Sequence, residues 1–255
     1  MTHEIVTVSS NNEVAEGLFL LRFQSDRIAR ATAPGQFVNI RVTDVFVPFL
    51  RRPFSVSRVE GRLVEILFNV VGGGTQILSS KRPGDTLDLL GPLGKPFDVH
   101  DEFETALIVA GGLGVAPFPL LTDWLLREEK QILTFLGARN AYQLYKQHLK
   151  NLRVATDDGS EGLKGTVIDL LDRYLQTHTV SKPKIFGCGP TKMLQALSEY
   201  AHRKRIPCEL SLEGEMACGI GLCQGCPVER RNSGAKYALV CKEGPTFNCE
   251  EIVLS

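Results

Sequence analysis

Four cysteines near the end of the chain constrain this sequence more than any other feature. Four residues separate Cys218 from Cys223, two separate Cys223 from Cys226, and fourteen separate Cys226 from Cys241. This is the plant-type ligand spacing of a [2Fe–2S] cluster. Four thiolates must converge on two irons there, so the chain between the first three cysteines must wrap tightly. The sequence therefore predicts these four cysteines as cluster ligands.

The residues between the cysteines suit such a wrap. Gly219, Gly221 and Gly225 tolerate positive φ, and they let backbone N–H groups approach the cluster sulfurs. A structural zinc site and free thiols are the alternatives. Zinc knuckles usually pair one C-x2-C with a second pair or with histidine, and no histidine follows His202. The pattern therefore favours iron and sulfide over zinc.

The remaining cysteines do not indicate a disulfide scaffold. Seven cysteines in 255 residues are few for such a scaffold, and their number is odd. Cys208 and Cys249 lie outside the ligand spacing, so we expect both to be ordinary, small buried residues.

Composition excludes several classes of protein. Lys+Arg and Asp+Glu both number 29, so the net charge is zero. Non-specific nucleic-acid binding and binding to an anionic membrane surface both need a basic excess. The N-terminus lacks the basic and apolar regions of a secretory signal. Glycines and prolines interrupt the longest uncharged apolar run, 106–121, which is shorter than the roughly 20 residues of a membrane span. We expect a soluble, cytoplasmic protein.

The composition and the pattern of expected strands and helices change twice along the sequence, which predicts three domains. Residues 1–99 hold short β-rich runs separated by Gly/Pro turns, which is typical of an antiparallel barrel, with a sandwich as the alternative. Residues 100–206 alternate strands with helices, which indicates a doubly wound, mainly parallel sheet. Residues 207–255 are rich in glycine and cysteine and too few for a large core, so we expect the cysteines to supply a metal or disulfide staple there.

Within the central region the sequence predicts alternating strands and helices. Apolar runs give the strands, and amphipathic stretches give the helices between them. The expected strands are 106–110, 131–136, 152–155 and 184–186, and the expected helices are 115–129, 142–149, 166–177 and 191–203. Ligands of such sheets bind beyond the carboxyl ends of the strands.

A second motif stands in the β-rich half. Arg52-Pro53-Phe54-Ser55 combines a cation, a hydroxyl and an aromatic ring, which could pair with a phosphate and hold a planar ring. Gly72-Gly73-Gly74-Thr75 follows about twenty residues later, and its backbone N–H groups could meet a pyrophosphate. The alternatives are an ordinary strand end and a hairpin turn.

Two glycine-rich turns each lie between a strand and a helix. Gly111-Gly112-Leu113-Gly114 is similar to a dinucleotide-phosphate turn, although its spacing is not G-x-G-x-x-G. Gly187-Cys188-Gly189-Pro190 places a proline near the first helical turn. Two such turns at one sheet edge predict a nucleotide lying across both; plain tight turns are the alternative. Asp157-Asp158-Gly159-Ser160 after a strand is expected to be a turn rather than an acid/base pair.

The order of these motifs resembles the ferredoxin–NADP reductase superfamily over essentially the whole chain. In that family the RPFS and GGGT motifs hold FAD, the GGLG and GCGP turns hold the nicotinamide nucleotide, and the Cys188 position lies near the flavin. The resemblance implies FAD contacts at Arg52, Pro53, Phe54, Ser55, Asn69, Val70, Val71, Gly74 and Thr75, and nucleotide contacts at Gly111, Gly112, Gly114, Gly187, Cys188, Gly189 and Pro190.

The cysteine-rich tail, with MACGIGLCQGC (216–226) and VCKEGPTF (240–247), narrows the resemblance. It looks most like the electron-transfer subunits of two-subunit dihydroorotate dehydrogenases, which pass electrons between a partner's FMN and NAD in pyrimidine biosynthesis. The resemblance implies an FMN-containing catalytic subunit as partner, in a heterotetramer of two copies each. No residue here is then needed as the acid or base for dihydroorotate.

Three points stay open at this stage. The reductase subunits of NADH-dependent ferredoxin:NADP oxidoreductases and of cytosolic hydrogenases share the layout, so they are the second hypothesis. A zinc-stapled binding protein that has lost its flavin is the third. No acidic residue follows the strand 131–136 to accept the NAD ribose, and Arg139 could instead meet the 2′-phosphate of NADP.

Overall fold

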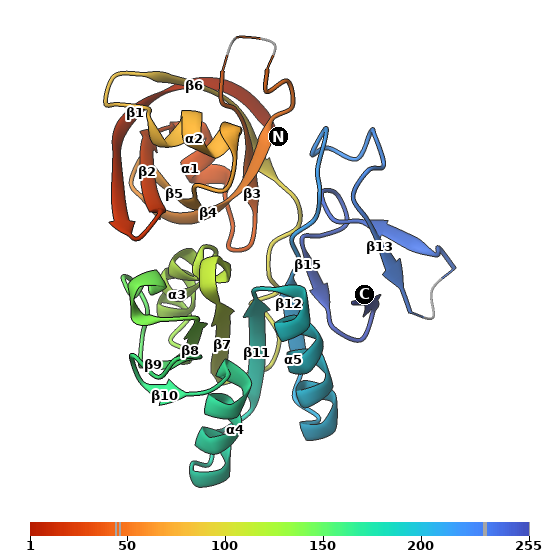
Figure 1. Cartoon of the computed structure of the whole chain (residues 1–255). Helices are drawn as coiled ribbons and strands as arrows, with labels where there is room; N and C mark the ends of the chain where they lie inside the picture. Colours follow the sequence, from red (N-terminus) through yellow and green to blue (C-terminus); the bar gives the residue numbers. More distant parts are fainter. Residues whose placement is uncertain (44, 46, 232–233, 255) are drawn as a thin grey trace.

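The computed structural model describes residues 1–43, 45, 47–231 and 234–254. It has three parts: a closed β-barrel, a sheet flanked by helices, and a small C-terminal lobe (Figure 1). The antiparallel barrel and the parallel sheet confirm the predicted fold class. Among the described residues, no helix combines the length and the apolar character that crossing a bilayer requires.

Six antiparallel strands close the barrel in the order β1-β2-β5-β4-β3-β6. Alternate side chains point inward, so Ile40, Val56 and Ile66 are fully buried in the barrel core. Two short helices, α1 (Asp26–Ala31) and α2 (Gly73–Ser79), accompany the barrel and were not predicted. The strands are β1 (Thr2–Ala15), β2 (Leu18–Gln24), β3 (Phe37–Arg41), β4 (Arg52–Glu60), β5 (Leu63–Asn69) and β6 (Thr86–Leu93).

The central sheet has seven strands in the order β10-β9-β8-β7-β11-β12-β15. All its pairings are parallel except the last, in which β15 lies antiparallel to β12. Its elements are β7 (Thr105–Gly111), α3 (Phe118–Arg127), β8 (Gln131–Ala138), β9 (Leu152–Thr156), β10 (Leu163–Lys164), α4 (Val167–Thr177), β11 (Pro183–Cys188), α5 (Thr191–Lys204), β12 (Cys208–Ser211) and β15 (Thr246–Asn248).

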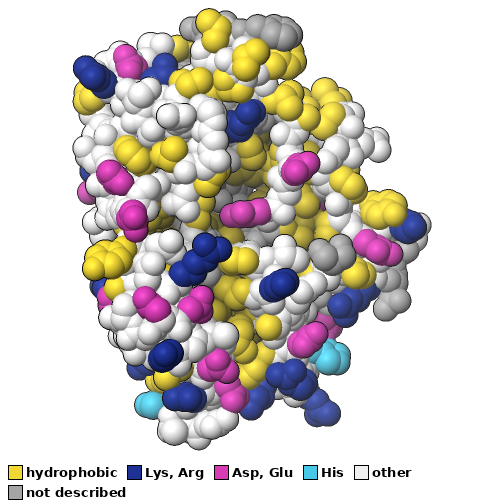
Figure 2. Space-filling view, viewed as in Figure 1, with side chains coloured by type: hydrophobic (Ala, Val, Ile, Leu, Met, Phe, Trp, Pro, Cys, Tyr) yellow, Lys and Arg dark blue, Asp and Glu magenta, His cyan; other side chains and the backbone are white. Residues whose placement is uncertain are grey.

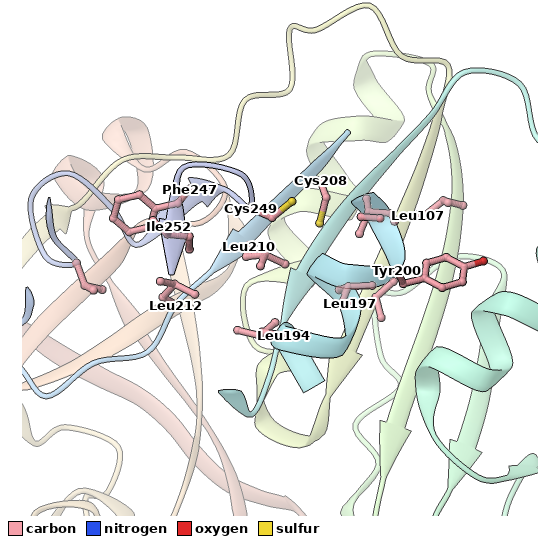
Figure 3. Close-up of a cluster of buried hydrophobic side chains, with 14 of the residues drawn as sticks. Leu107, Leu194, Leu197, Tyr200, Cys208, Leu210, Leu212, Phe247, Cys249 and Ile252 are labelled. Carbon is pink, nitrogen blue, oxygen red and sulfur yellow. The ribbon is translucent and has the colours of Figure 1, made fainter. Parts of the chain in front are cut away.

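Both faces of the central sheet are covered, which explains its unbroken apolar strands. Every residue of β7 is buried. Ile108 belongs to the core under α3, whereas the next residue, Val109, belongs to the core under α4 and α5. Figure 3 shows part of the second core, where Leu194 and Leu197 of α5 lie near Leu210 of β12.

The segment after residue 206 is tied to the central sheet. It supplies β12 and β15, and between them lie most of the small lobe and all four predicted ligands. The lobe has a three-stranded sheet of order β14-β13-β16, formed by Pro227–Arg230 (β13), Tyr237–Leu239 (β14) and Ile252–Val253 (β16). Because the segment after residue 206 shares strands with the central sheet, the division into domains 1–99, 100–206 and 207–255 stays a prediction.

Two predictions for the helices need correction. The helix expected over 142–149 is wrong: only a 3-10 turn, Ala141–Gln143, forms there. Its single turn is capped by Asn140, and His148 and Asn151 adopt left-handed backbone that an α-helix cannot contain. The helix expected from residue 115 begins instead at Phe118, after a 3-10 turn and Pro117.

A buried cation joins the loop after the barrel to the central sheet. The ammonium of Lys184, on β11, is 2% exposed and donates to Asp101 at 2.5 Å and to Glu209 at 2.7 Å. Burial alone would lower the pKa of Lys184, but these two carboxylates raise it. The acidic cluster around Asp98, Asp101 and Glu209 thus already holds a cation.

We expect Lys184→Met to lower the free energy of unfolding by about 3 kcal/mol, because it leaves the half-buried Glu209 without its buried cation. Urea denaturation of the two proteins measures the difference. Lys182→Met is the matched control: Lys182 is 64% exposed in its pair with Glu104 and should not change stability measurably. Equal losses of unfolding free energy in the two variants would contradict the role of Lys184 as the buried cation that pairs with Glu209.

Candidate functional site

The four predicted ligands form one cysteine cluster in the small lobe. The Sγ atoms of Cys226 and Cys241 lie 3.2 Å apart. The backbone N–H of Cys223 approaches Cys218 Sγ at 3.3 Å, and that of Cys241 approaches Cys226 Sγ at 3.4 Å. Cys218 thus lies beside Cys223, and Cys226 lies beside Cys241, while the assignment of all four as cluster ligands stays a prediction.

The loop around the cysteines folds as expected, with one difference. Gly219 and Gly221 adopt φ of 70° and 84°, which other residues rarely adopt. Gly225 does not; its neighbour Gln224 takes the left-handed conformation instead, at φ 56°. The N–H of Gly225 approaches Cys223 Sγ at 3.4 Å, so this glycine serves the second predicted purpose, close approach to sulfur.

The loop favours thiolate at one end of the cysteine cluster. Burial opposes ionisation of Cys218, but backbone N–H groups of Cys223 and Ile220 donate to its sulfur and lower its pKa to about 6. Burial and the hydrogen bond with Cys226 instead raise the pKa of Cys241 to about 12. Converging thiols with inward N–H donors are the donor set that an iron–sulfur cluster needs.

One hydrogen bond fastens the cysteine loop to the barrel. Asn39, fully buried on β3, donates through Nδ2 to the carbonyl of Cys218 at 3.1 Å. The same residue pairs in register with Pro53 of the RPFS motif on β4. A side chain at Gly219 would collide with Asn39, so glycine is required there for close approach as well. Sequence reasoning missed Asn39; a polar residue in the apolar run FVNIR was the available signal.

The RPFS strand lines a cavity of about 290 Å³ between the barrel, the central sheet and the small lobe. Figure 2 shows this face hollowed between the three parts, with hydrophobic side chains in the hollow. The cavity has one cation, aromatic walls and several hydroxyls, which suit a planar ring that carries phosphate. The predicted residues lining it are Arg52, Pro53, Phe54, Ser55, Asn69, Val71, Thr75 and Cys188.

The two glycine-rich turns meet in a second cavity of about 520 Å³. They meet because β7 and β11 are neighbours, with Ala110 opposite Cys188. Asn69, Val71, Leu113 and Glu213 line this cavity as well as the first. The predicted residues lining the second cavity are Gly111, Gly112, Gly114, Gly189 and Pro190.

Three predicted residues lie outside both cavities. Val70 is 38% exposed next to Val71. Gly74 faces Arg52, whose Nε would lie 3.1 Å from a Cβ at that position. Gly187 is buried in the sheet, where a Cβ would lie 2.5 Å from Leu197. In this structure Gly74 therefore leaves room for the side chain of Arg52, and Gly187 leaves room for helix α5.

The glycine motif at 72–75 forms the start of helix α2 rather than a hairpin turn. The hydroxyl of Thr75 accepts the N–H groups of Val71 and Gly72 at 2.9 and 3.1 Å. Asp158 likewise accepts the N–H of Ser160 at 2.9 Å in a turn, which confirms the turn prediction for that segment.

Glu213 is the acidic residue that sequence reasoning missed. It follows β12 and lines both cavities. Glu16, from the turn between β1 and β2, lines the second cavity, as Arg139 does. No local sequence pattern marks either residue, because each arrives from a different part of the chain.

Cys188 also faces the first cavity, and it is a neutral thiol at ordinary pH. It is 3% exposed, and burial raises the pKa of its thiol. A backbone N–H at Gly189 and a hydrogen bond with Ser211 do not offset that burial. The part of the cavity wall that Cys188 forms is therefore uncharged, as suits packing against a flat apolar ring.

Comparison with known proteins gives consistent matches. Residues 213–253 match the family described as the iron–sulfur cluster binding domain of dihydroorotate dehydrogenase B. The dihydroorotate dehydrogenase B (NAD(+)) electron transfer subunit of Bacillus velezensis is 36% identical over 98% of both chains. The subunits of the same name from Desulforamulus reducens and a Geobacillus species are 37% identical over 94%, and 36% identical over 100%, of both chains.

Solved structures share the fold. A chain of an NADH-dependent reduced ferredoxin–NADP oxidoreductase, described in relation to flavin-based electron bifurcation, has a TM-score of 0.87 and 30% identity, covering 98% of this chain and 90% of that chain. A ferredoxin NADP+ reductase from Neisseria gonorrhoeae, solved with FAD and NADP, has a TM-score of 0.67. It is 16% identical and covers 80% of this chain and 92% of that chain, so it shows the fold alone.

We expect Cys223→Ser to abolish the iron content and visible absorption of the cluster while FAD stays bound, because serine supplies no thiolate. Iron and flavin analysis of the purified protein measures both. Cys208→Ser is the matched control, since Cys208 lies on β12 away from the ligand loop. Full iron content in Cys223→Ser, or zinc in its place in the wild type, would refute the ligand assignment.

In the metal-free protein, Cys218 should react with iodoacetamide with half-maximal rate near pH 6, because the thiolate is the nucleophile and the pKa of Cys218 is lowered to about 6. The thiolate is populated above that pH, so labelling rises from pH 5 to pH 7. Mass spectrometry of labelled peptides follows each cysteine. A half-maximum near that of an ordinary thiol, about pH 8.5, would contradict the role of the loop N–H donors.

Proposed function

Since this chain belongs to the electron transfer subunits of dihydroorotate dehydrogenase B, we propose that it passes electrons from the FMN of a catalytic subunit to NAD+ in pyrimidine biosynthesis. The path runs through a [2Fe–2S] cluster at Cys218, Cys223, Cys226 and Cys241 and through FAD in the first cavity. The observation that carries the proposal is the Asn39 hydrogen bond, which joins the cluster loop to the flavin strand.

When bound, FAD links two-electron hydride chemistry to single-electron steps, and the cluster carries one electron at a time. The chain supplies position and electrostatics. Arg52 offers a cation to a pyrophosphate, and Ser55 offers a hydroxyl to the ring. The N–H groups of the cysteine loop stabilise negative sulfur. No residue of this chain acts on dihydroorotate in this proposal, so its acid or base belongs to the partner.

The nicotinamide nucleotide lies across the two glycine-rich turns in this proposal. Both turns line the second cavity, which opens beside the flavin cavity at Leu113 and Glu213. Glu16 and Arg139 face the same cavity from opposite elements. A carboxylate suits the ribose hydroxyls of NAD and repels the 2′-phosphate of NADP. Glu16 thus supports NAD in spite of Arg139, as the names of the relatives do.

The tip of the cysteine loop is suited to contact a partner. Leu222, adjacent to Cys223, is 78% exposed. Val47 and Leu50, in the loop between β3 and β4, are 75% and 43% exposed. Figure 2 shows hydrophobic side chains along the upper rim of this face. Exposed apolar groups beside a redox centre favour electron transfer to a docked protein partner over transfer to small solutes.

We propose a heterotetramer with two copies of each subunit, located in the cytoplasm.

An alternative partner has support in the structural comparison. The bifurcating oxidoreductase chain matches 98% of this chain at a TM-score of 0.87. A reductase subunit of that kind would dock a larger flavoprotein with further iron–sulfur centres. The cofactor sites of this chain would be the same in both cases, so the partner alone distinguishes them.

Anaerobic purification from native cells, followed by mass spectrometry of the associated proteins, tests the proposal. An FMN protein together with dihydroorotate-dependent reduction of NAD+ by the complex is the expected result. A larger flavoprotein rich in iron–sulfur motifs, with no dihydroorotate-dependent activity, would overturn it in favour of the alternative.

We expect Leu222→Asp to weaken binding of the catalytic subunit at least about tenfold, because a charge replaces an apolar anchor in a desolvated contact. Titration of the separately purified subunits measures Kd. Leu126→Asp, on helix α3, is the matched control: Leu126 is 44% exposed and lies outside the small lobe. Equal Kd for the wild type and Leu222→Asp would remove the cysteine loop from the docking surface.

A further inference from the structure

Two cysteines that the cluster pattern leaves out lie face to face in the core. Cys208 begins β12, and Cys249 follows β15 directly. The pairing of Glu209 with Asn248 places them opposite each other, and the N–H of Cys249 donates to the carbonyl of Cys208 at 3.0 Å. The two thiols are close enough to shift each other's pKa, and Figure 3 shows the two sulfurs adjacent.

The strand register places these two cysteines at a Cα separation that a disulfide can span. Residues directly opposite in a hydrogen-bonded antiparallel pair have Cα atoms about 5.5 Å apart, and disulfides span about 4.4–6.8 Å. Cys208 and Cys249 fall in this class by register and by their backbone hydrogen bond. The structure has no disulfide between them.

A cavity gives small molecules access to the pair. Each cysteine is only 3% exposed, yet both line a cavity of about 590 Å³. His202, Arg205 and Glu250 line the cavity as well, and an ion pair of 3.5 Å joins His202 to Glu250. A small polar oxidant that enters this cavity meets charged and polar groups beside the two sulfurs.

The two thiols have different chemical characters. The hydrogen bond from Cys208 and one from Ser198 lower the pKa of Cys249 to about 7, against its burial. The hydrogen bond with Cys249 and burial raise the pKa of Cys208. Cys249 is therefore the nucleophile of the pair, and Cys208 is a neutral thiol placed to react second.

The position of the pair in the chain gives a bond between them a clear consequence. All four cluster cysteines lie between Cys208 and Cys249 in the sequence. The pair stands where this segment leaves the central sheet at β12 and returns to it at β15. A covalent link there closes a loop that contains the whole cluster site and restricts its unfolding.

We propose that Cys208 and Cys249 form a peroxide-sensitive dithiol, whose disulfide fastens the cluster segment to the central sheet. The Cys249 thiolate attacks hydrogen peroxide: an S–O bond forms, the O–O bond breaks, and water leaves after protonation, which gives a sulfenic acid. Cys208 then attacks the Cys249 sulfur, so that the S–S bond forms and a second water leaves. Two thiols are oxidised, and one peroxide is reduced to two waters.

This inference goes beyond electron transfer and does not depend on the identity of the partner. Its test treats the anaerobically purified holoprotein with limiting hydrogen peroxide, removes the excess with catalase, and alkylates free thiols. Peptide mapping without reduction should find Cys208 linked to Cys249 while Cys188 is still alkylated. The map also separates this link from any bond between Cys226 and Cys241. Free, alkylated Cys208 and Cys249 in protein whose Cys188 is already oxidised would overturn the proposal.

Two alanine variants test the order of the steps. In Cys208→Ala, peroxide should leave a sulfenic acid on Cys249 that dimedone traps, because the second thiol is missing. In Cys249→Ala, dimedone should trap nothing at Cys208. Both variants should hold their cluster before treatment, since neither residue is a ligand. The opposite labelling pattern would overturn the assignment of Cys249 as the nucleophile.

Loss of iron to a chelator tests the fastening itself. The cross-linked wild type should lose iron severalfold more slowly than untreated wild type, and peroxide should give no such slowing in Cys208→Ala. A cross-link that forms without changing the rate of iron loss would overturn the claim that it restrains the cluster segment.

Discussion

The hydrogen bond from Asn39 to the carbonyl of Cys218 is the contact on which the functional arrangement depends. It is made by a fully buried side chain of the barrel and a backbone group of the cysteine loop, two parts that are distant in sequence. A buried amide without its acceptor costs free energy, so the barrel favours the docked loop over any other position. Asn39 also pairs with Pro53, so the flavin strand and the cluster loop share one anchor.

The cluster segment has a second support, which is covalently continuous with the central sheet. Because it departs from β12 and returns through β15, both its ends are held by strand pairing. The small lobe buries little apolar surface of its own and needs these supports. The cysteine loop is thereby held between a barrel contact on one side and two sheet strands on the other. These contacts hold the cysteine loop at a fixed position beside the first cavity.

Spacing and periodicity were enough to predict the architecture and the presence of an iron–sulfur domain at residues 213–253. The C-x4-C-x2-C pattern works because its residues are close in sequence, so chain geometry alone brings them together. The helix over 142–149 failed because apolar residues at 144 and 145 pack into the core from an irregular segment that ends at two left-handed residues. Periodicity cannot distinguish such a segment from a helix.

The residues that sequence reasoning missed have one property in common: their partners come from distant elements. Glu16, Asn39 and Glu213 each reach the site from a different part of the fold, and no short motif records such a meeting. The same limit applies to Cys208 and Cys249, which appear ordinary until strand register places one opposite the other.

Glycine illustrates how one residue type serves several purposes within a single motif. In GGLG, Gly112 lies at φ 54° with open space beyond it, whereas Gly114 lies against the backbone of Cys188, where no Cβ fits. The first keeps the cavity open to a nucleotide, and the second lets the two turns touch. Because the turns touch, β7 and β11 form the second cavity together, and it adjoins the first cavity at Leu113 and Glu213. The glycines that seem to mark a ligand site in the sequence thus act first by bringing two strand ends together, and the ligand site follows from that contact.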